Sequence, residues 1–252
     1  PNMGGGEHAA NYIEAQVIDW TKQMFGFPSQ ASGLLVSGGS MANLIGLAVA
    51  RQAQAKFDLR TQGIYGAAAR MMLYCSAETH SSVQRAVEVL GLGNESIRKI
   101  PVNDQFQIDI TALEAALAAD KAAGLQPFCV IGTAGTTNTG GMDDLNQLAD
   151  ICQREGLWFH VDGAFGAFAA LTPEHQHLTV GMERADSVAF DWHKWPQLPF
   201  DVGCVLVRDG ETHRQTFTLR PDYLKHEERG VAGGDMWLSD YGVELTRGFK
   251  AL

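Results

Sequence analysis

The sequence predicts an α/β protein built on a mostly parallel β-sheet with helices on both of its faces. Apolar runs of strand length alternate with amphipathic stretches of helical length along the chain, and this alternation is typical of βαβ units. The chain has 252 residues, 45% of them hydrophobic, which is enough for a large buried core and excludes a disordered protein. Together these observations favour a three-layer α/β/α arrangement.

The first half of the chain begins with a helix expected over 11–25, because Ile13 and Val17 lie close to helical spacing. The segment Gly26-Phe27-Pro28 ends this helix. Two strand–helix pairs follow, in each of which a short apolar run precedes a longer amphipathic stretch. Their predicted ranges are 33–36 with 40–55 and 71–75 with 81–90.

The second half contains two more helical stretches and four apolar runs that are short enough to be strands. The predicted helices cover 109–122, with Thr111 near its start, and 143–155. The predicted strands cover 128–133, 157–161, 187–190 and 203–207. The chain begins at Pro1 without a methionine and stops at Leu252 within a stretch predicted to be helical. We therefore expect a fragment, or a processed piece, of a longer protein.

Composition argues against several kinds of partner. Lys and Arg number 19 and Asp and Glu 29, so the net charge is −10, which disfavours nucleic acid and anionic membranes as partners. No run of about 18 apolar residues occurs, so no membrane-spanning segment is expected. The four cysteines form no CxxC pair and mostly lie in apolar runs. We therefore expect no metal site, and reduced core thiols in a cytoplasmic protein.

Polar or glycine-rich segments follow the ends of five predicted strands, which is where open α/β sheets bind their ligands. The first is Ser37-Gly38-Gly39-Ser40, between a strand and the next helix. Its glycines let the backbone come close to a ligand, and the N–H groups of a helix N-terminus suit a phosphate. A simple helix cap made by Ser40 is the alternative.

Two further segments are weak signals when taken alone. His80 lies just past a predicted strand, where a histidine serves as a structural hydrogen-bonding group more often than as a catalytic one. The segment 132–141 contains Thr136 and is rich in glycines and hydroxyl groups. That composition is also typical of a solvated turn.

Two charged side chains are more telling. Asp162 ends a very apolar strand, and a carboxylate there is costly unless it meets a cation or several donors. Lys194 lies between Trp192 and Trp195, just after another apolar strand. Partial desolvation lowers the pKa of an amine and favours the neutral nucleophile that forms an imine. The alternative is a lysine that reaches from an apolar loop to water.

Two enzymatic interpretations compete for these residues. Ser40, Asp162 and His193 occur in the order of a serine hydrolase, although the last glycine of the nucleophile elbow is missing. That interpretation gives Lys194 no task. The chemistry of pyridoxal 5′-phosphate uses all five segments, because this cofactor needs a phosphate site, a lysine for a Schiff base, a carboxylate for the pyridine nitrogen and a stacking partner for the ring.

Three sequence blocks carry a resemblance to a known family. They are 79–83 (Thr-His-Ser-Ser-Val), 160–165 (His-Val-Asp-Gly-Ala-Phe) and 191–195 (Asp-Trp-His-Lys-Trp). In their order and spacing they look like the signature blocks of the group II pyridoxal-phosphate-dependent amino-acid decarboxylases, which include the aromatic-L-amino-acid, histidine and glutamate decarboxylases. The likeness runs from about Glu14 to Leu252.

The resemblance implies the large domain of fold type I, with a seven-stranded sheet, working as a homodimer. It implies that Lys194 forms the internal aldimine with the cofactor, that Asp162 pairs with the pyridine nitrogen, and that His80 stacks on the ring. The other implied cofactor contacts are Gly39 and Ser40 at the phosphate, Thr136 near the ring, Ala164 against the ring and His193 beside the lysine.

The implied reaction is the decarboxylation of an L-amino acid to an amine, through a quinonoid form of the cofactor. The implied organisation is one cofactor-binding large domain over 1–252, without the family's N-terminal segment and small C-terminal domain. Within 227–241 the place of a family tyrosine falls near Leu238. A pyridoxal-phosphate-dependent aldehyde synthase, or another fold type I lyase or transferase, is therefore the first alternative. A serine hydrolase and a non-catalytic remnant are more distant ones.

Overall fold

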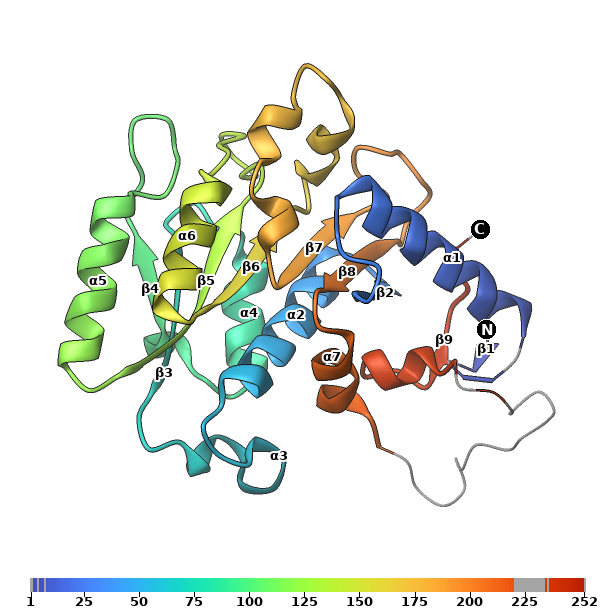
Figure 1. Cartoon of the computed structure of the whole chain (residues 1–252), viewed down its shortest axis with the longest axis horizontal. Coiled ribbons are helices and arrows are strands. Elements are labelled where there is room, and N and C mark those ends of the chain that lie inside the picture. The colour runs from blue at the N-terminus through green and yellow to red at the C-terminus, as the bar shows by residue number, and fades with distance from the viewer. Residues whose placement is uncertain (1, 4, 7, 220–233, 235, 252) are drawn as a thin grey trace.

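The protein, described by a computed structural model, is built around a seven-stranded β-sheet (Figure 1). The structure describes residues 2–3, 5–6, 8–219, 234 and 236–251. The strands of the sheet are β2 (Ser32–Val36), β3 (Met71–Ser76), β4 (Ile97–Ile100), β5 (Gln126–Thr133), β6 (Trp158–Asp162), β7 (Ser187–Asp191) and β8 (Gly203–Val207). Their spatial order is β2-β8-β7-β6-β5-β3-β4, in which β8 is antiparallel to both neighbours and all other pairs are parallel. The predicted mostly parallel sheet is confirmed.

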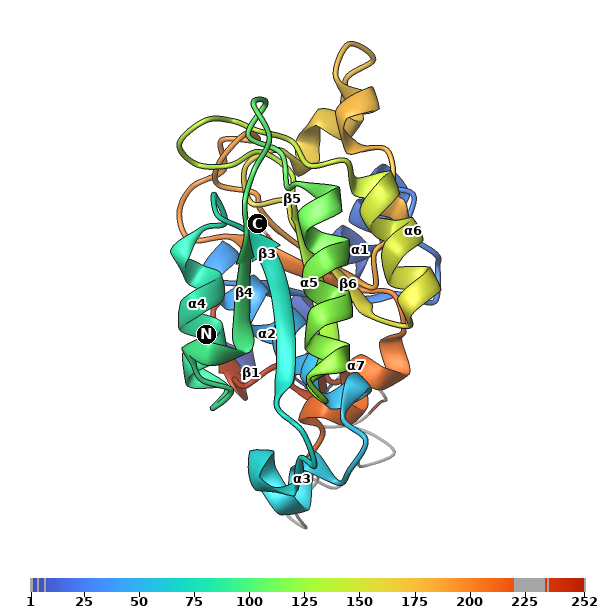
Figure 2. The same ribbon diagram turned by 90° about the vertical axis from the view of Figure 1, so that its left-hand side faces the viewer.

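Helices cover both faces of this sheet, as Figure 2 shows nearly edge-on. They are α1 (Ala9–Met24), α2 (Gly39–Gln54), α3 (Leu59–Gln62), α4 (Ser81–Val89), α5 (Ile110–Ala122), α6 (Leu145–Glu155) and α7 (Gly210–Phe217). One buried core joins α1, α5 and α6 to one face, and a second joins α2, α4 and α7 to the other. None of the helices in the described ranges has the length and apolarity needed to cross a bilayer.

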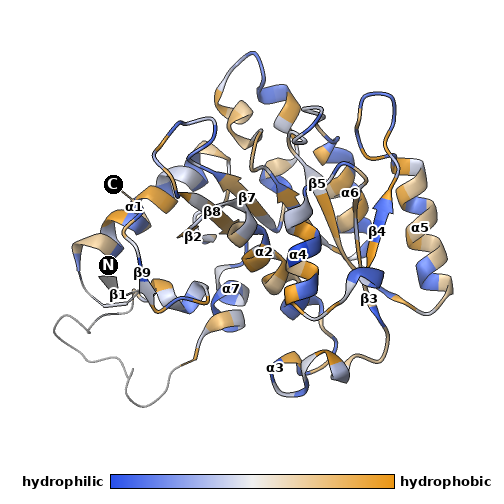
Figure 3. Cartoon of the chain, turned by 180° about the vertical axis from the view of Figure 1, so that it is seen from behind, coloured by the Kyte–Doolittle hydropathy of each residue, from blue (hydrophilic) through white to orange (hydrophobic). Residues whose placement is uncertain are grey.

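The central strands form because their residues are apolar without interruption, which suits a sheet that is buried on both faces. Figure 3 shows this hydrophobicity along β5 and β7, and it shows β4 as hydrophilic. Strand β4 was not predicted, since Arg98 and Lys99 interrupt its apolar pattern. It lies at the edge of the sheet, where charged side chains are tolerated, and Arg98 forms an ion pair with the buried Asp120 of α5.

Two other parts of the chain differ from the sequence-based expectations. The mostly polar helix α7 was not predicted; the Asp209 side chain caps its N-terminus by accepting the backbone N–H groups of Glu211 and Thr212. The prediction of a helix at the end of the chain is wrong. The short strand β9 (Thr246–Arg247) pairs there with β1 (Asn2–Met3), and a buried ion pair between Arg247 and Glu14 of α1 holds this segment in place.

The buried side chain of His213 on α7 links three segments of the fold. Its Nε2 donates to the backbone oxygen of Tyr241 at 2.8 Å, and its Nδ1 accepts from the hydroxyl of Ser32 at 2.8 Å. Burial lowers the pKa of His213 to about 3. The imidazole is therefore neutral in the folded protein over the whole range in which an unfolded histidine takes up a proton.

We expect the substitution His213→Gln to reduce the loss of stability on acidification. The folded pKa lies below the unfolded value of about 6.5, so the contribution of His213 is complete above that pH. It is lost as the pH falls toward 3, by up to about 1.4 kcal/mol per pH unit. Urea unfolding of both proteins at pH 7 and pH 5 measures this difference. The same stability loss in both proteins would contradict the assignment.

Candidate active site

A cavity of about 370 Å³ opens at the carboxyl ends of the strands, where the segments that follow β2, β3, β6 and β7 meet. Four chain segments far apart in the sequence therefore supply one site. Of the residues predicted from the sequence, those that line it are Gly39, Ser40, His80, Ala164, His193 and Lys194. Its other lining residues are Ser37, Gly38, Met41, Asn43, Ser82, Asp191 and Phe200.

One wall of the cavity is the N-terminus of α2. Gly38 is the N-cap residue, at φ +149°, and no side chain caps the helix there. The first N–H groups of α2 consequently have no acceptor within the helix and favour an anion. A Cβ on Gly39 would lie 2.8 Å from Asp191 Oδ2 and 3.2 Å from Ala164 Cβ, so only glycine fits there. The alternative that Ser40 is the N-cap is wrong, because Ser40 lies within the first turn.

The loop after β7 places an amine at the cavity. Lys194 Nζ lies 3.1 Å from Oδ2 of the buried Asp191. Asp191 Oδ1 has no hydrogen-bond partner among the described residues, and it lies 3.7 Å from His193 Nε2. His193 Nδ1 accepts the N–H of Val202, which fixes the ring. Sequence reasoning gave Asp191 no role, although a carboxylate three residues before a lysine at a strand end was visible.

The buried Asp162 lies behind this wall of the cavity rather than in its lining. Its Oδ1 accepts the N–H of Ala164 at 3.2 Å, and its Oδ2 accepts from Asn43 Nδ2 at 3.0 Å. Burial raises the pKa of Asp162, while these two hydrogen bonds and the nearby Lys194 and His80 oppose that rise. The carboxylate thus has neutral donors in contact, and the amine of Lys194 lies only further away.

His80 is both a structural and a cavity residue. It is the N-cap of α4, where its Nδ1 accepts the backbone N–H of Ser82 at 3.2 Å and meets the Ser82 hydroxyl at 2.9 Å. The ring is exposed and lines the cavity. The helix cap therefore holds the imidazole in a fixed place at the mouth of the site.

Thr136 is not brought into the cavity lining. Its hydroxyl meets that of Thr139 at 2.6 Å and accepts the N–H of Gly141 at 2.9 Å, so it closes the turn after β5. This turn lies beside the segment after β6, since a Cβ on Gly135 would approach Phe165 to 3.0 Å. Thr136 itself is buried, and only residues 137–140 of the turn are exposed, so the interpretation of 132–141 as a solvated turn holds for those residues and not for Thr136.

The serine hydrolase interpretation is not supported by the geometry. Asp162 accepts hydrogen bonds from Ala164 and Asn43, and His193 from Val202. No hydrogen bond joins Ser40, Asp162 and His193 to one another, and all three belong to the described part of the chain. These residues do not form a catalytic triad.

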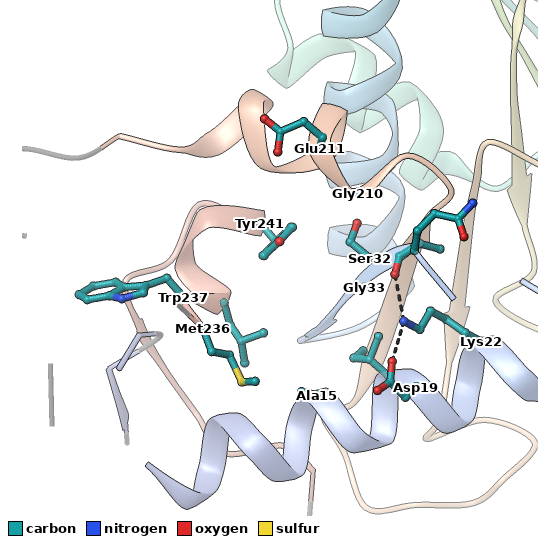
Figure 4. Close-up of a pocket in the computed structure, with 14 residues that line it drawn as sticks. Ala15, Asp19, Lys22, Ser32, Gly33, Gly210, Glu211, Met236, Trp237 and Tyr241 are labelled. Atoms are coloured by element: carbon teal, nitrogen blue, oxygen red, sulfur yellow. Dashed lines mark hydrogen bonds and ion pairs between the residues drawn. The ribbon is translucent and has the colours of Figure 1, made fainter. Parts of the chain in front are cut away.

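The segment around Leu238 lies away from the cavity that contains Lys194. Residues 227–233 and 235 of the expected loop are outside the described residues. Trp237, Leu238 and Tyr241 line a second cavity of about 340 Å³ between α1, β2 and α7. Figure 4 shows this second cavity, with α1 along one side of it. The side chains at the place of the family tyrosine therefore contribute nothing to the cavity around Lys194.

Comparison with known proteins identifies the family. Residues 8–252 match the family model described as "Pyridoxal-dependent decarboxylase conserved domain". The chain belongs to the pyridoxal-dependent decarboxylases. This membership confirms the family resemblance and the cofactor that were predicted from the sequence.

Similarity to individual members of the family supports this assignment. It is 44% identical over 243 residues to the aromatic-L-amino-acid decarboxylase of Bacillus atrophaeus, covering 96% of this chain and 48% of the relative. It is similar to Oryza sativa TDC solved with PLP and tryptamine, with TM-score 0.86 and 32% identity over 97% of this chain and 51% of that one. It is also similar to Rhodiola rosea 4-hydroxyphenylacetaldehyde synthase, with TM-score 0.82 and 28% identity over 96% and 50%. The chain spans about half the length of these relatives.

The residues present fit pyridoxal 5′-phosphate. The uncapped start of α2 offers N–H groups to a phosphate, and the glycines there leave room for it. The amine of Lys194 suits an aldehyde. The buried Asp162 has neutral donors but no cation in contact, which suits a protonated ring nitrogen. Within the described ranges, no group of three or more His, Cys, Asp or Glu side chains could hold a metal ion.

Proposed function

We propose that the protein decarboxylates an L-amino acid, releasing CO2 and an amine, and that residues 1–252 are its cofactor-binding large domain. The observation that carries this proposal is the convergence of the Lys194 amine, the uncapped N-terminus of α2 and the His80 ring on one cavity, with Asp162 directly behind it. The similarity to an aromatic-L-amino-acid decarboxylase makes an aromatic amino acid the first substrate to test.

Pyridoxal phosphate, when bound, supplies an aldehyde that condenses with amines and a ring that takes up the electron pair left when CO2 departs. Gly39 and Ser40 would hold its phosphate at the start of α2. His80 would cover one face of the ring and the small side chain of Ala164 the other. The ionised Asp162 would keep a proton on the ring nitrogen, because a carboxylate favours the cationic form of a basic neighbour.

Proton transfer at Lys194 falls to Asp191 in this proposal. The amine must be neutral to attack an aldehyde, and Asp191 Oδ2, 3.1 Å from Nζ, is placed to accept its proton. His193, with Nδ1 engaged by Val202, presents Nε2 on the side of Asp191. The family resemblance adds that His193, beside the lysine, would reach the phosphate or the substrate. The proximity of Thr136 to the ring stays a prediction; the hydrogen bonds of its turn hold Thr136 in place.

An exposed apolar patch beside the cavity supports a homodimer. Phe165, Trp195, Leu198 and Phe200 are exposed by 45%, 53%, 44% and 84%, and Phe200 also lines the cavity. The rings of Phe165 and Trp195 are in edge contact, and large apolar groups exposed together are typical of protein interfaces. We propose that a second copy of the protein covers this patch and excludes water from the site. The four buried, free cysteines support a reducing, cytoplasmic location.

Aldehyde formation by oxidative deamination is the second candidate, favoured by the similarity to the 4-hydroxyphenylacetaldehyde synthase. Both reactions release CO2, but aldehyde formation also needs a two-electron oxidant, O2, and releases ammonia and H2O2 with the aldehyde, whereas decarboxylation needs no oxidant and releases the amine. They would use the same cofactor site. They would differ at the carbon that loses CO2, which keeps its nitrogen in the amine and exchanges it for oxygen in the aldehyde.

We expect the full-length protein, loaded with pyridoxal phosphate, to produce one amine for each CO2 from at least one aromatic L-amino acid. Product masses and CO2 release over a panel of L-amino acids measure this, with D-enantiomers as controls. An aldehyde with ammonia in place of the amine would select the second candidate. Absence of CO2 release from every amino acid would contradict both.

A further inference from the structure

A chain of buried polar side chains runs from behind the cavity to its lining, and an asparagine that lines the cavity lies at its branch point. Asn43 of α2 meets three partners: His160 Nε2 at 2.9 Å, Asp162 Oδ2 at 3.0 Å and Ser82 Oγ at 3.0 Å. Asn43 is 1% exposed, and the three partners are buried as well. The family blocks do not include this residue, which contacts Asp162 directly and is linked to His80 through Ser82.

The direction of each hydrogen bond follows from Asp162, because an ionised carboxylate can only accept. The amide nitrogen of Asn43 therefore faces Asp162, and Asn43 Oδ1 faces His160 Nε2. Burial lowers the pKa of His160 to about 3, so the ring is neutral. Its hydrogen is on Nε2, because Asn43 Oδ1 can only accept. His160 Nδ1 then accepts from the Ser187 hydroxyl at 2.7 Å, and Ser187 Oγ accepts the indole N–H of Trp158 at 2.8 Å.

The same orientation of the Asn43 carboxamide fixes the bonds on the side of Ser82. One amide hydrogen of Asn43 goes to Asp162 and the other to Ser82 Oγ. The Ser82 hydroxyl then gives its hydrogen to His80 Nδ1. Reversing any bond would place two donors, or two acceptors, face to face in a buried layer.

We propose that Asn43 is a positioning residue that holds Asp162 as a hydrogen-bond acceptor and, through Ser82, holds His80 with its hydrogen on Nε2. This inference rests on the proposed function, since its consequence is felt at the ring nitrogen of the cofactor. Without the amide of Asn43, Asp162 Oδ2 loses its one side-chain donor and turns or takes up a proton. A protonated Asp162 no longer favours a cationic ring nitrogen.

The test compares two ligands, pyridoxal phosphate and its carbocyclic analogue with C–H in place of the ring nitrogen. We expect wild type to bind pyridoxal phosphate about tenfold or more tightly than the analogue, because only the former pairs with Asp162. Asn43→Leu should shrink this ratio several-fold. Asn11→Leu is the matched control, since Asn11 is also a buried asparagine in a helix but does not line the cavity, and it should keep the wild-type ratio.

The outcomes separate the inference from the proposed function. An unchanged ratio in Asn43→Leu, or equal weakening of both ligands, would overturn the positioning role and leave the cofactor site intact. A wild type that does not discriminate between the ligands would overturn the role of Asp162 and this inference with it. If Asn43→Leu does not fold, Asn43→Asp keeps the shape and should also shrink the ratio. Nitrogen-15 spectra of the unliganded wild type give an independent test: His160 should be protonated at Nε2, and protonation at Nδ1 would overturn the assignment.

Discussion

The substitution Lys194→Ala is expected to abolish turnover, by a factor on the order of 10³ or more, with the fold intact. Lys194 is the one lysine in the described lining of the cavity, so the variant has no amine there to hold an aldehyde. The loss of stability should be about 1–3 kcal/mol, because the variant leaves the buried carboxylate of Asp191 without the amine it pairs with. Turnover, the visible absorption of the bound cofactor and thermal unfolding measure these effects.

The matched control for Lys194 is Lys121→Ala. Lys121 is similarly exposed and also forms an ion pair with a carboxylate, Glu155, but on the α5–α6 surface. It should behave as wild type in all three measurements. Turnover by Lys194→Ala at a rate near that of wild type would show that another amine does this work.

The substitution Asp162→Asn is expected to weaken pyridoxal phosphate binding by about 10- to 100-fold. This factor corresponds to the free energy of a hydrogen bond between charged groups. The asparagine keeps the size of the side chain but removes the negative charge. Its amide group also faces a donor, either the N–H of Ala164 or Asn43 Nδ2. Binding of inorganic phosphate should stay unchanged, because the N-terminus of α2 is unaltered. Titration with each ligand measures both effects.

Asp143→Asn is the control for Asp162. Asp143 is equally buried and accepts two backbone N–H groups, from Ile108 and Thr133, and burial raises its pKa to about 6. It does not line the cavity, so its loss should affect stability without changing cofactor affinity. Wild-type affinity and turnover in Asp162→Asn would refute the ring-nitrogen role.

The sequence predicted the parts of the fold whose residues are buried on both sides. The strands β5 and β7 are continuous apolar runs, so their pattern alone was sufficient. Strand β4 and helix α7 depend on partners that are distant in sequence: Arg98 on Asp120, and His213 on Ser32 and Tyr241. Local patterns carry no information on such contacts, and the end of the chain was wrongly predicted for the same reason.

The candidate site was predictable where short segments carry the chemistry. Lys194, His80 and Asp162 each follow a strand end, and parallel topology brings those ends together. Asn43 was missed because its partner Asp162 lies 119 residues away. A signal was present, since Asn43 is a lone polar residue within the apolar run of α2, and a buried polar side chain needs partners.

The most direct measurement of the central claim is the site of reductive trapping. The protein is incubated with pyridoxal phosphate, reduced with borohydride and digested. Mass spectrometry of the peptides then locates the modified lysine. The chain has seven lysines, and we predict that the phosphopyridoxyl group is found on Lys194 alone and is lost when free phosphate and excess amine compete. A label spread over several lysines, or located on a lysine other than 194, would contradict the account.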